Sequence, residues 1–551
     1  MPENSAGTLI LRLFDSREGA SSRLLPRWIF LRCLAAIYFS AFYSLLFQIK
    51  GLIGPEGVFP ASDYLAAVAR QVSLPKLWFA PTVFWIDSSS HALMLVTWIG
   101  LLASLAAFAN LWPRLTFLLC FVCFLSFVSA AGEFSNYQSD GMLLEAGFIA
   151  LFFAPRGFRP GLGTAFPPSR ASLFLLQWEW FRIYFESGMV KLVSGDRQWR
   201  NLTAMDEYYQ NGPLPTWIGW YVEHLPHWFH VASAGGTLLL ELVLVWMLFL
   251  PRRARTACFF IVTPWEIGVI LTANYTFLNY LVLSLGILLL DDQFLLTLIP
   301  ARYRTAMAAM NLRADTSTAI KESFAKQDRS GERTVPMGVL SRFRGYLSAF
   351  GLALSAVMLM WIFYNTTVEM IGIPFRNHPL PTWPIAALEP FRIANQYGLF
   401  AVMTNGRYEI EFQESNDGQN WTAYSFRNKP QALNEAPRIY APYQPRFDWN
   451  LWFASLGDWR QDEIVPVTEQ RLLENDRDVL ALFRGDPFPQ TPPRFVRAVL
   501  WQYWFTSREE KRATGNWWRR KYLGLYGPEL SKTPDGHIAI VEWPNELPVH
   551  D

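Results

Sequence analysis

Long apolar runs separated by short polar segments occupy the first two thirds of the chain. A bilayer core of about 30 Å requires roughly 20 apolar residues in a helix, and fewer where neighbouring helices cover it. On this template the sequence predicts about nine transmembrane helices, at Trp28–Ile49, His91–Trp112, Arg114–Ala131, Gly141–Ala154, Ala171–Lys191, Phe229–Leu250, Thr256–Leu271, Tyr275–Leu290 and Tyr346–Tyr364. Because the eighth follows the seventh so closely, these two are either separate helices or one bent hairpin.

The pattern changes after Asn365. Arg407–Gln413 and Trp421–Arg427 alternate polar and apolar residues, and the turn-forming sequence ESNDGQN between them is typical of a β-hairpin. Further on, Glu469–Phe483 and Arg494–Tyr522 are expected to be helical. The predicted fold class is therefore a polytopic α-helical membrane protein followed by a soluble, β-rich C-terminal domain of the α+β, sandwich-like type.

The Lys and Arg residues of the loops predict the orientation in the membrane, since cytoplasmic loops carry an excess of them. Arginines concentrate before the first span and in the loops near residues 156–170 and 252–255, whereas loops 132–140 and 272–274 carry neither Lys nor Arg. The N-terminus is therefore expected inside and the C-terminal domain outside. The expected divisions are a cytoplasmic segment 1–27, a helix bundle 28–290 with outward loops 50–90 and 192–228, a basic cytoplasmic loop 291–345 whose part 305–340 is mobile, a last span 346–366, and an extracytoplasmic domain 367–551.

Composition agrees with a membrane protein, because only 17% of the residues are charged whereas soluble domains usually hold about 25%. The net charge of +2 gives no reason to expect nucleic acid. All four cysteines lie in apolar runs that favour packing, and none follows Asp291, so an outward domain needs no disulfides. No cleavable signal peptide is expected, because no apolar run precedes Trp28.

The fifth predicted span carries charges that a membrane helix usually lacks. Glu179, Arg182 and Glu186 lie at positions i, i+3 and i+7, on one helical face. One interpretation is an arginine that neutralises two carboxylates inside the bundle. The other is a polar outward pocket in which Lys191, partly removed from water, serves as a base or binds an anion. The candidate binding residues of the polar loop that follows are Asp196, Trp199, Arg200 and Asn201.

Other polar residues add weaker signals. Asp140, Glu145, Glu241 and Glu266, in or beside other spans, indicate a polar bundle interior with room for a ligand or a partner segment. Histidines recur at three-residue steps in EHLPHWFH, residues 223–230, but a proline interrupts the helix, which favours an interfacial anchor over a metal site. We predict no metal and no cofactor, and the common enzyme signatures are absent from the sequence.

Several long blocks resemble the lipase maturation factor family. They are GLIGPEGVFPA in the first outward loop, SGMVKLVSGDRQWRNLTAMDEYYQNGPLPTWIGWYVEHLP after the fifth span, and FRIANQYGLFAVMTNGRYEIEFQESNDGQNWTAYSFRNKP and APYQPRFDWNLWFASLG in the C-terminal region. The helices are also distantly similar to the vitamin K-dependent carboxylase-like (HTTM) bundle, in which a lysine occupies a place comparable to that of Lys191. Since the terminus ELPVHD does not resemble a retention signal, a bacterial-type member is expected.

The resemblance implies a chaperone-like assembly role. Animal members of the family reside in the endoplasmic reticulum membrane and help secreted lipases to fold and dimerise, through a C-terminal domain that faces the lumen. By this likeness, the expected partners are the lipid bilayer and a secreted client such as a lipase, and no oligomeric state is predicted. The candidate client-binding residues are Trp421, Arg446, Asp448, Trp449, Trp452 and Trp459.

Alternatives stay open from the sequence. The aromatic residues of YQPRFDWNLWF can form the core of the C-terminal domain, with Arg446 and Asp448 as a structural ion pair. A different class of function is a membrane enzyme that modifies a lipid or a peptide at the Lys191 pocket, and a third is a structural subunit of a larger envelope complex.

Overall fold

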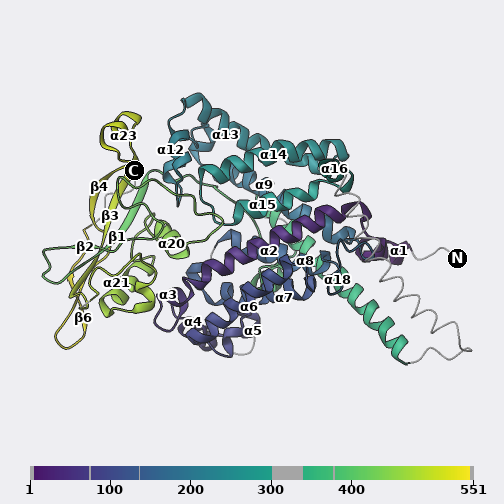
Figure 1. Cartoon of the computed structure of the whole chain (residues 1–551), viewed down its shortest axis with the longest axis horizontal. Helices are drawn as coiled ribbons and strands as arrows, with labels where there is room; N and C mark the ends of the chain where they lie inside the picture. The colour runs from purple at the N-terminus through teal and green to yellow at the C-terminus, as the bar shows by residue number, and fades with distance from the viewer. Residues whose placement is uncertain are drawn as a thin grey trace, which may run out of the picture.

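The computed structural model describes residues 5–72, 76–135, 137–300, 339–375, 379–489 and 491–545. A bundle of helices forms one part of the molecule, and the sheet of the C-terminal region lies against one end of it (Figure 1). Most of the predicted cytoplasmic loop 291–345, including 305–338, lies outside the described residues.

Within the described residues, six helices are long and apolar enough to cross a membrane. The elements that hold them are α2 (Leu24–Leu46), α6 (Ser90–Phe108), α7 (Pro113–Ala130), α13 (His227–Leu242) with the short 3-10 helix η5 (Leu244–Phe249), α14 (Arg252–Thr272) and α18 (Val339–Gly372). A seventh candidate is a broken span, Leu278–Leu289 with Asp292–Leu298, which is bent by 105°. It contains α15 (Leu278–Gly286), η6 (Ile287–Leu289) and α16 (Asp292–Leu298). Because α14 ends at Thr272 and α15 begins at Leu278, the seventh and eighth predicted spans are separate helices.

The prediction of nine spans is not confirmed, because two of the predicted helices do not meet the same criteria. α8 (Gln138–Phe153) has only 16 residues. α9 (Arg170–Val193) is long enough, but it carries the buried charged residues Glu179, Arg182, Glu186 and Lys191. α9 packs against α8, α13, α15 and α18. Neighbouring helices therefore surround α9, and burial within protein accommodates charged groups that lipid would exclude.

Short helices complete the helical region. They are α1 (Ser5–Phe14), η1 (Ser16–Glu18), η2 (Ser21–Arg23), α3 (Ile49–Ile53), α4 (Ala61–Gln71), α5 (Lys76–Phe79), η3 (Val83–Trp85), η4 (Gly132–Ser135), α10 (Arg197–Arg200), α11 (Tyr208–Asn211) and α12 (Trp217–Glu223). α3, α4 and α5 are the α-helices of the first predicted outward loop, and α10, α11 and α12 are those of the second, among the described residues.

The C-terminal region contains one antiparallel six-stranded sheet among its described residues, with the order β2-β1-β3-β5-β6 and with β4 also paired to β3. Its strands are β1 (Arg407–Ser415), β2 (Thr422–Ala423), β3 (Phe495–Phe505), β4 (Trp518–Leu525), β5 (Glu529–Lys532) and β6 (Ile538–Glu542). The predicted hairpin is confirmed, since Gln413 pairs with Ala423 across the ESNDGQN turn. The expectation of a sandwich is wrong, because helices rather than a second sheet cover the buried face.

The helices of this region are α19 (Trp383–Leu388), η7 (Glu389–Phe391), α20 (Arg446–Ala454), α21 (Ile464–Glu474), α22 (Arg477–Leu480) and α23 (Arg508–Thr514). The helix expected over 494–522 is wrong, because β3 and β4 occupy most of that range and only α23 between them is helical. The sequence FVRAVLWQYWF of β3 is rich in aromatic and β-branched residues, which favour strands. Both faces of β3 are largely covered, so its apolar residues do not alternate strictly.

The C-terminal domain rests on one end of the helix bundle. The residues that follow α2, α7, α9 and α14 each form a hydrogen bond with the segment 397–446, through Gln48, Phe134, Asp196 and Asn274 respectively. These four helices therefore end on the same side. One continuous hydrophobic core extends from the bundle to the buried face of the sheet, so the two parts pack as one body.

Candidate functional site

The polar loop after α9 holds the chain segment that leads into the C-terminal sheet. The backbone N–H of Met403 donates to Asp196 at 2.7 Å, and the indole N–H of Trp199 donates to the carbonyl of Phe400 at 2.9 Å. Within α9 itself, Glu186 accepts a hydrogen bond from the backbone N–H of Tyr397 at 2.7 Å. The end of α9 and the start of α10 thus form a continuous docking strip for residues 397–403.

Arg182 lies at the centre of this attachment. Its guanidinium forms a buried ion pair with Glu145 of α8, lies 3.8 Å from Glu186, and donates to the carbonyl of Asn395 at 2.6 Å. Glu145 also accepts a hydrogen bond from the hydroxyl of Tyr397 at 2.9 Å. Arg182 therefore neutralises Glu186, as the first interpretation expects, but its second partner is Glu145, and the Glu179 oxygens have no hydrogen-bond partner among the described residues. The same arginine also binds the segment from the C-terminal region.

Arg446 provides a second buried connection. Its two terminal nitrogens donate to the two carboxylate oxygens of Asp140 at 2.7 and 2.8 Å, and one of them also donates to the carbonyl of Phe134 at 2.6 Å. Asp140 lies in the first turn of α8, so this bidentate pair joins α20 to the bundle. The expected pairing of Arg446 with Asp448 is wrong, because Asp448 instead accepts a hydrogen bond from Asn428 at 2.6 Å.

The other predicted binding residues are divided between the interior and the surface. Trp449 and Trp452 are buried, and Trp452 donates to the carbonyl of Asn211 at 3.1 Å. Trp421 and Trp459 are half-buried. Arg200 and Asn201 are exposed at the end of α10. Trp421 lies beside β2, with the guanidinium of Arg497 3.8 Å from its ring centre.

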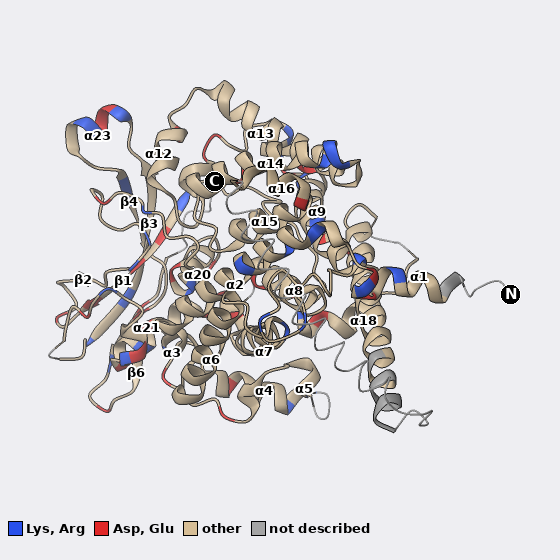
Figure 2. Ribbon diagram, turned by 45° about the vertical axis from the view of Figure 1, so that its right-hand side comes forward, with Lys and Arg blue, Asp and Glu red and all other residues tan. Residues whose placement is uncertain are grey.

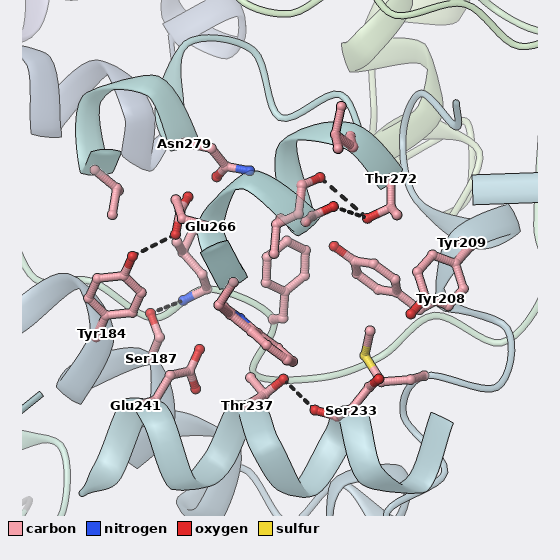
Figure 3. A pocket seen from close by; sticks show the side chains of 18 of the residues that line it. Tyr184, Ser187, Tyr208, Tyr209, Ser233, Thr237, Glu241, Glu266, Thr272 and Asn279 are labelled. Carbon is pink, nitrogen blue, oxygen red and sulfur yellow. Dashed lines mark hydrogen bonds between the residues drawn. The ribbon is translucent and has the colours of Figure 1, made fainter. Parts of the chain in front are cut away.

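Lys191 borders a cavity of about 430 Å³ beside α9 (Figure 3). Its ammonium donates to both carboxylate oxygens of Glu241, each at 2.8 Å, and lies 5.1 Å from the centre of the Trp199 ring. Nearby, the hydroxyl of Tyr184 donates to Glu266 at 2.6 Å. Two of the carboxylates expected to make the interior polar thus face this cavity. Because Lys191 is held in an ion pair, the geometry favours a structural role over that of a free base.

The three histidines of EHLPHWFH have separate partners. His224 contacts the backbone carbonyls of Trp220 and Thr506, His227 lies 2.9 Å from a carboxylate oxygen of Asp206, and His230 contacts a backbone carbonyl. In the part of the chain that the structure describes, no group of three or more His, Cys, Asp or Glu side chains is placed to hold a metal ion.

Sequence reasoning missed an apolar strand at the edge of the sheet. β6 ends the strand order and, among the described residues, pairs only with β5. Its side chains Ile540 and Val541 are 43% and 52% exposed, and Trp543 just beyond it is also exposed. The alternation of polar and apolar residues in HIAIVEW, residues 537–543, was the available signal for a strand. The sequence does not show that both faces of this strand are exposed to solvent.

Asp448 makes the stability of the C-terminal domain depend on pH. Burial raises the pKa of this carboxyl from 3.8 to about 6. Because the folded state binds the proton more tightly than the unfolded state, stability falls as pH rises from about 4 to about 6. Replacing Asp448 with Asn keeps an acceptor for Asn428 and should stabilise the domain by roughly 2–3 kcal/mol at pH 7.5.

This gain should shrink to less than about 1 kcal/mol near pH 4, where Asp448 is protonated in the folded state and close to half protonated in the unfolded state. Thermal unfolding of the full chain and of Asp448→Asn, each followed at pH 7.5 and pH 4, measures the difference. An equal gain at both pH values would contradict the assignment to this carboxyl.

Comparison with known proteins gives matches over nearly the whole chain. A family model described as "Lipase maturation factor transmembrane domain" matches residues 25–297, and one described as "Lipase maturation factor C-terminal domain" matches residues 393–528. Lipase maturation factor 2 of Gallus gallus is 33% identical, over 95% of this chain and 84% of the relative. Lipase maturation factor 2 of Homo sapiens is 32% identical, over 93% of this chain and 83% of the relative. Lipase maturation factor 1 of Bos taurus is 29% identical, over 97% of this chain and 94% of the relative. No solved structure matches the chain.

Proposed function

Since the chain belongs to the lipase maturation factor family, we propose that it is a membrane-anchored folding factor that assists a secreted lipase through its C-terminal domain. Family membership supports the general role, that of a membrane protein in lipase maturation. The finer proposal is that the client binds along the free edge of β6. The observation that carries it is the exposed apolar strand with no partner on its outer side among the described residues.

An unpaired strand edge offers a row of backbone donors and acceptors to an extended segment of another chain. Ile540 and Val541 both remain exposed at this edge, Val541 as the extra residue where the register between β5 and β6 shifts. An incompletely folded lipase exposes apolar strands that have not yet found their own neighbours. Backbone pairing with β6 would cover such a strand without requiring a particular client sequence.

We further propose that the C-terminal domain lies outside the cytoplasm. Several arginines meet at the end of the bundle away from the sheet: Arg27 donates to the carbonyl of Phe166, Arg170 to that of Glu18, and Arg252 to the carboxylate of Asp291. Figure 2 shows Lys and Arg near α1 and α16 at this end. An excess of basic residues is typical of cytoplasmic loops, which supports an N-terminus inside and a C-terminal domain in the lumen or periplasm.

The enzyme alternative at Lys191 has no support in this geometry, because both oxygens of Glu241 engage the ammonium. The similarity to carboxylase-like bundles and the bacterial-type assignment stay predictions.

The test is a substitution on the strand edge. Replacing Ile540 with Lys places a charge on the edge and should reduce the secreted activity of a co-expressed lipase at least about fivefold, because charged edge residues oppose strand pairing. The measurement is lipase activity in the medium of cells that lack their own maturation factor, at equal levels of the full chain. The matched control is Ile439→Lys, which changes another exposed isoleucine of the C-terminal region away from β6.

A photoreactive amino acid in place of Val541 crosslinks to the protein that binds along β6 and thereby identifies it. A crosslink to the lipase supports the proposal. A crosslink to a second copy of this chain, or equal losses of activity for Ile540→Lys and Ile439→Lys, would show that β6 is not the client site.

A further inference from the structure

The cavity beside Lys191 lies between two pairs of helices. α13 packs against α9 and α14 packs against α15, and the cavity occupies the space between these pairs. Its volume of about 430 Å³ lies within the range of roughly 300–1,000 Å³ that small-molecule sites occupy. α13 and α14 are both candidate membrane spans, and Trp199, Tyr208 and Phe400 also line the cavity, so it lies between these spans at the end that faces the C-terminal sheet.

One face of α13 lines the cavity, and three of its four side chains there are polar. Phe229, Ser233, Thr237 and Glu241 all line it and follow one another at intervals of four residues, which places them on the same side of the helix. Figure 3 shows Ser233, Thr237 and Glu241 along this helix, across the cavity from Thr272 and Asn279. Polar contacts are therefore available along one wall, while most other lining residues are apolar or aromatic.

The cavity opens sideways along α14. Pro264, Gly268 and Leu271 line it and are also exposed on the outer surface. The same helix exposes Phe260 and Ile267, and exposed apolar side chains on a membrane span face lipid. A molecule can thus enter from the bilayer beside α14 without passing through the aqueous phase.

The charges of the cavity favour an uncharged polar group. Glu241 neutralises Lys191, and Glu266 adds a carboxylate that is bonded to Tyr184. An anionic head group would therefore find no free cation among these residues. The side-chain nitrogen of Asn279 lines the cavity, is buried, and has no hydrogen-bond partner in the described part of the chain. A buried donor without a partner is costly, and a carbonyl or hydroxyl oxygen of a ligand would satisfy it.

We propose that this cavity binds one membrane lipid with an uncharged, hydroxyl-bearing head, of the diacylglycerol class. An acyl chain lies against the apolar wall that includes Val269 and Val282, and the head group meets Asn279 and the hydroxyl of Thr237. The lipid enters from the bilayer beside Gly268. This inference does not depend on the client proposal, since no residue of β6 takes part.

The test uses the purified full chain in nanodiscs that contain a diazirine-bearing diacylglycerol or, separately, a diazirine-bearing phosphatidylglycerol. After illumination, mass spectrometry maps the attached lipid. We expect diacylglycerol on peptides of α13 and α14. Gly268→Phe should lower this labelling about tenfold, the equivalent of losing the burial of roughly two methylene groups.

Gly235→Phe is the matched control. Both glycines lie within helices, a Cβ added at either meets no atom within 4 Å, and Gly235 does not line the cavity. Asn279→Leu is a second variant that removes the unpartnered donor and should also reduce labelling. The labelling of a variant is compared with that of the unaltered chain only when the variant purifies as a monodisperse protein.

Three results would overturn the proposal. One is equal labelling of Gly268→Phe and Gly235→Phe, and another is attachment of diacylglycerol outside α13 and α14. The third is equal labelling of these helices by the anionic phosphatidylglycerol, which would refute the preference for an uncharged head.

Discussion

Replacing Arg182 with Met is expected to prevent the chain from accumulating as folded protein. The substitution leaves Glu145 and Glu186 buried without their cation, next to Glu179, whose carboxylate oxygens have no hydrogen-bond partner in the described residues. Removing one member of a buried ion pair costs about 3–5 kcal/mol, and here two carboxylates lose the same partner. The yield of monodisperse protein after extraction from the membrane, and its thermal unfolding, measure the loss.

The control is Arg17→Met, because Arg17 is exposed and lies 3.8 Å from Asp15. A surface pair of this kind contributes about 0–1 kcal/mol, so this variant should match the unaltered chain. Adding Glu145→Gln to Arg182→Met should recover part of the yield, since one uncompensated charge is removed. Normal yield and stability of Arg182→Met alone would contradict the central role of this arginine.

Replacing Arg446 with Met is expected to loosen the C-terminal domain from the bundle. The bidentate bond to Asp140 and the bond to the carbonyl of Phe134 are both lost, and Asp140 remains buried without a cation. The expected cost is again about 3–5 kcal/mol. Hydrogen exchange should rise in residues 397–403, and a protease should cut the chain more readily between the bundle and β1.

The double variant Asp140→Leu with Arg446→Met separates the loss of the pair from the burial of a lone charge. Apolar replacement of a whole buried pair is often neutral or stabilising, so exchange in 397–403 should return toward that of the unaltered chain. Arg460→Met, which breaks an exposed pair with Asp458, should leave exchange unchanged. Equal exchange in Arg446→Met and the unaltered chain would refute this attachment.

The segment after α9 illustrates how far sequence reasoning reaches. The charges on this apolar helix predicted either a neutralised stripe or a reactive pocket, and the sequence could not choose between them. Lys191 pairs with Glu241, 50 positions away, because α13 packs against α9. The carboxylates in or beside other spans were all possible partners for these cations: Asp140, Glu145, Glu241 and Glu266. Only the arrangement of the helices pairs Arg182 with Glu145 and Lys191 with Glu241.

The C-terminal region shows the same limit. The hairpin of β1 and β2 was predictable, because the turn sequence and the alternation act locally. The helix expected over 494–522 failed, since β3 is covered on both faces and its pattern reflects neighbours that are distant in sequence. Residues predicted for client binding, among them Arg446 and Trp449, are buried at the junction with the bundle, whereas the exposed β6 was not selected.

By itself, the sequence determined that the chain is a membrane protein with a β-containing C-terminal domain, because lipid requires long apolar helices and turns have local signatures. It also carried the family blocks. Only the tertiary structure decided that Arg446 bonds to Asp140, 306 positions away, that α9 is enclosed by other helices, and that a cavity opens beside α14. The physical reason is that buried charges and cavities depend on which distant elements become neighbours, and packing alone sets those neighbours.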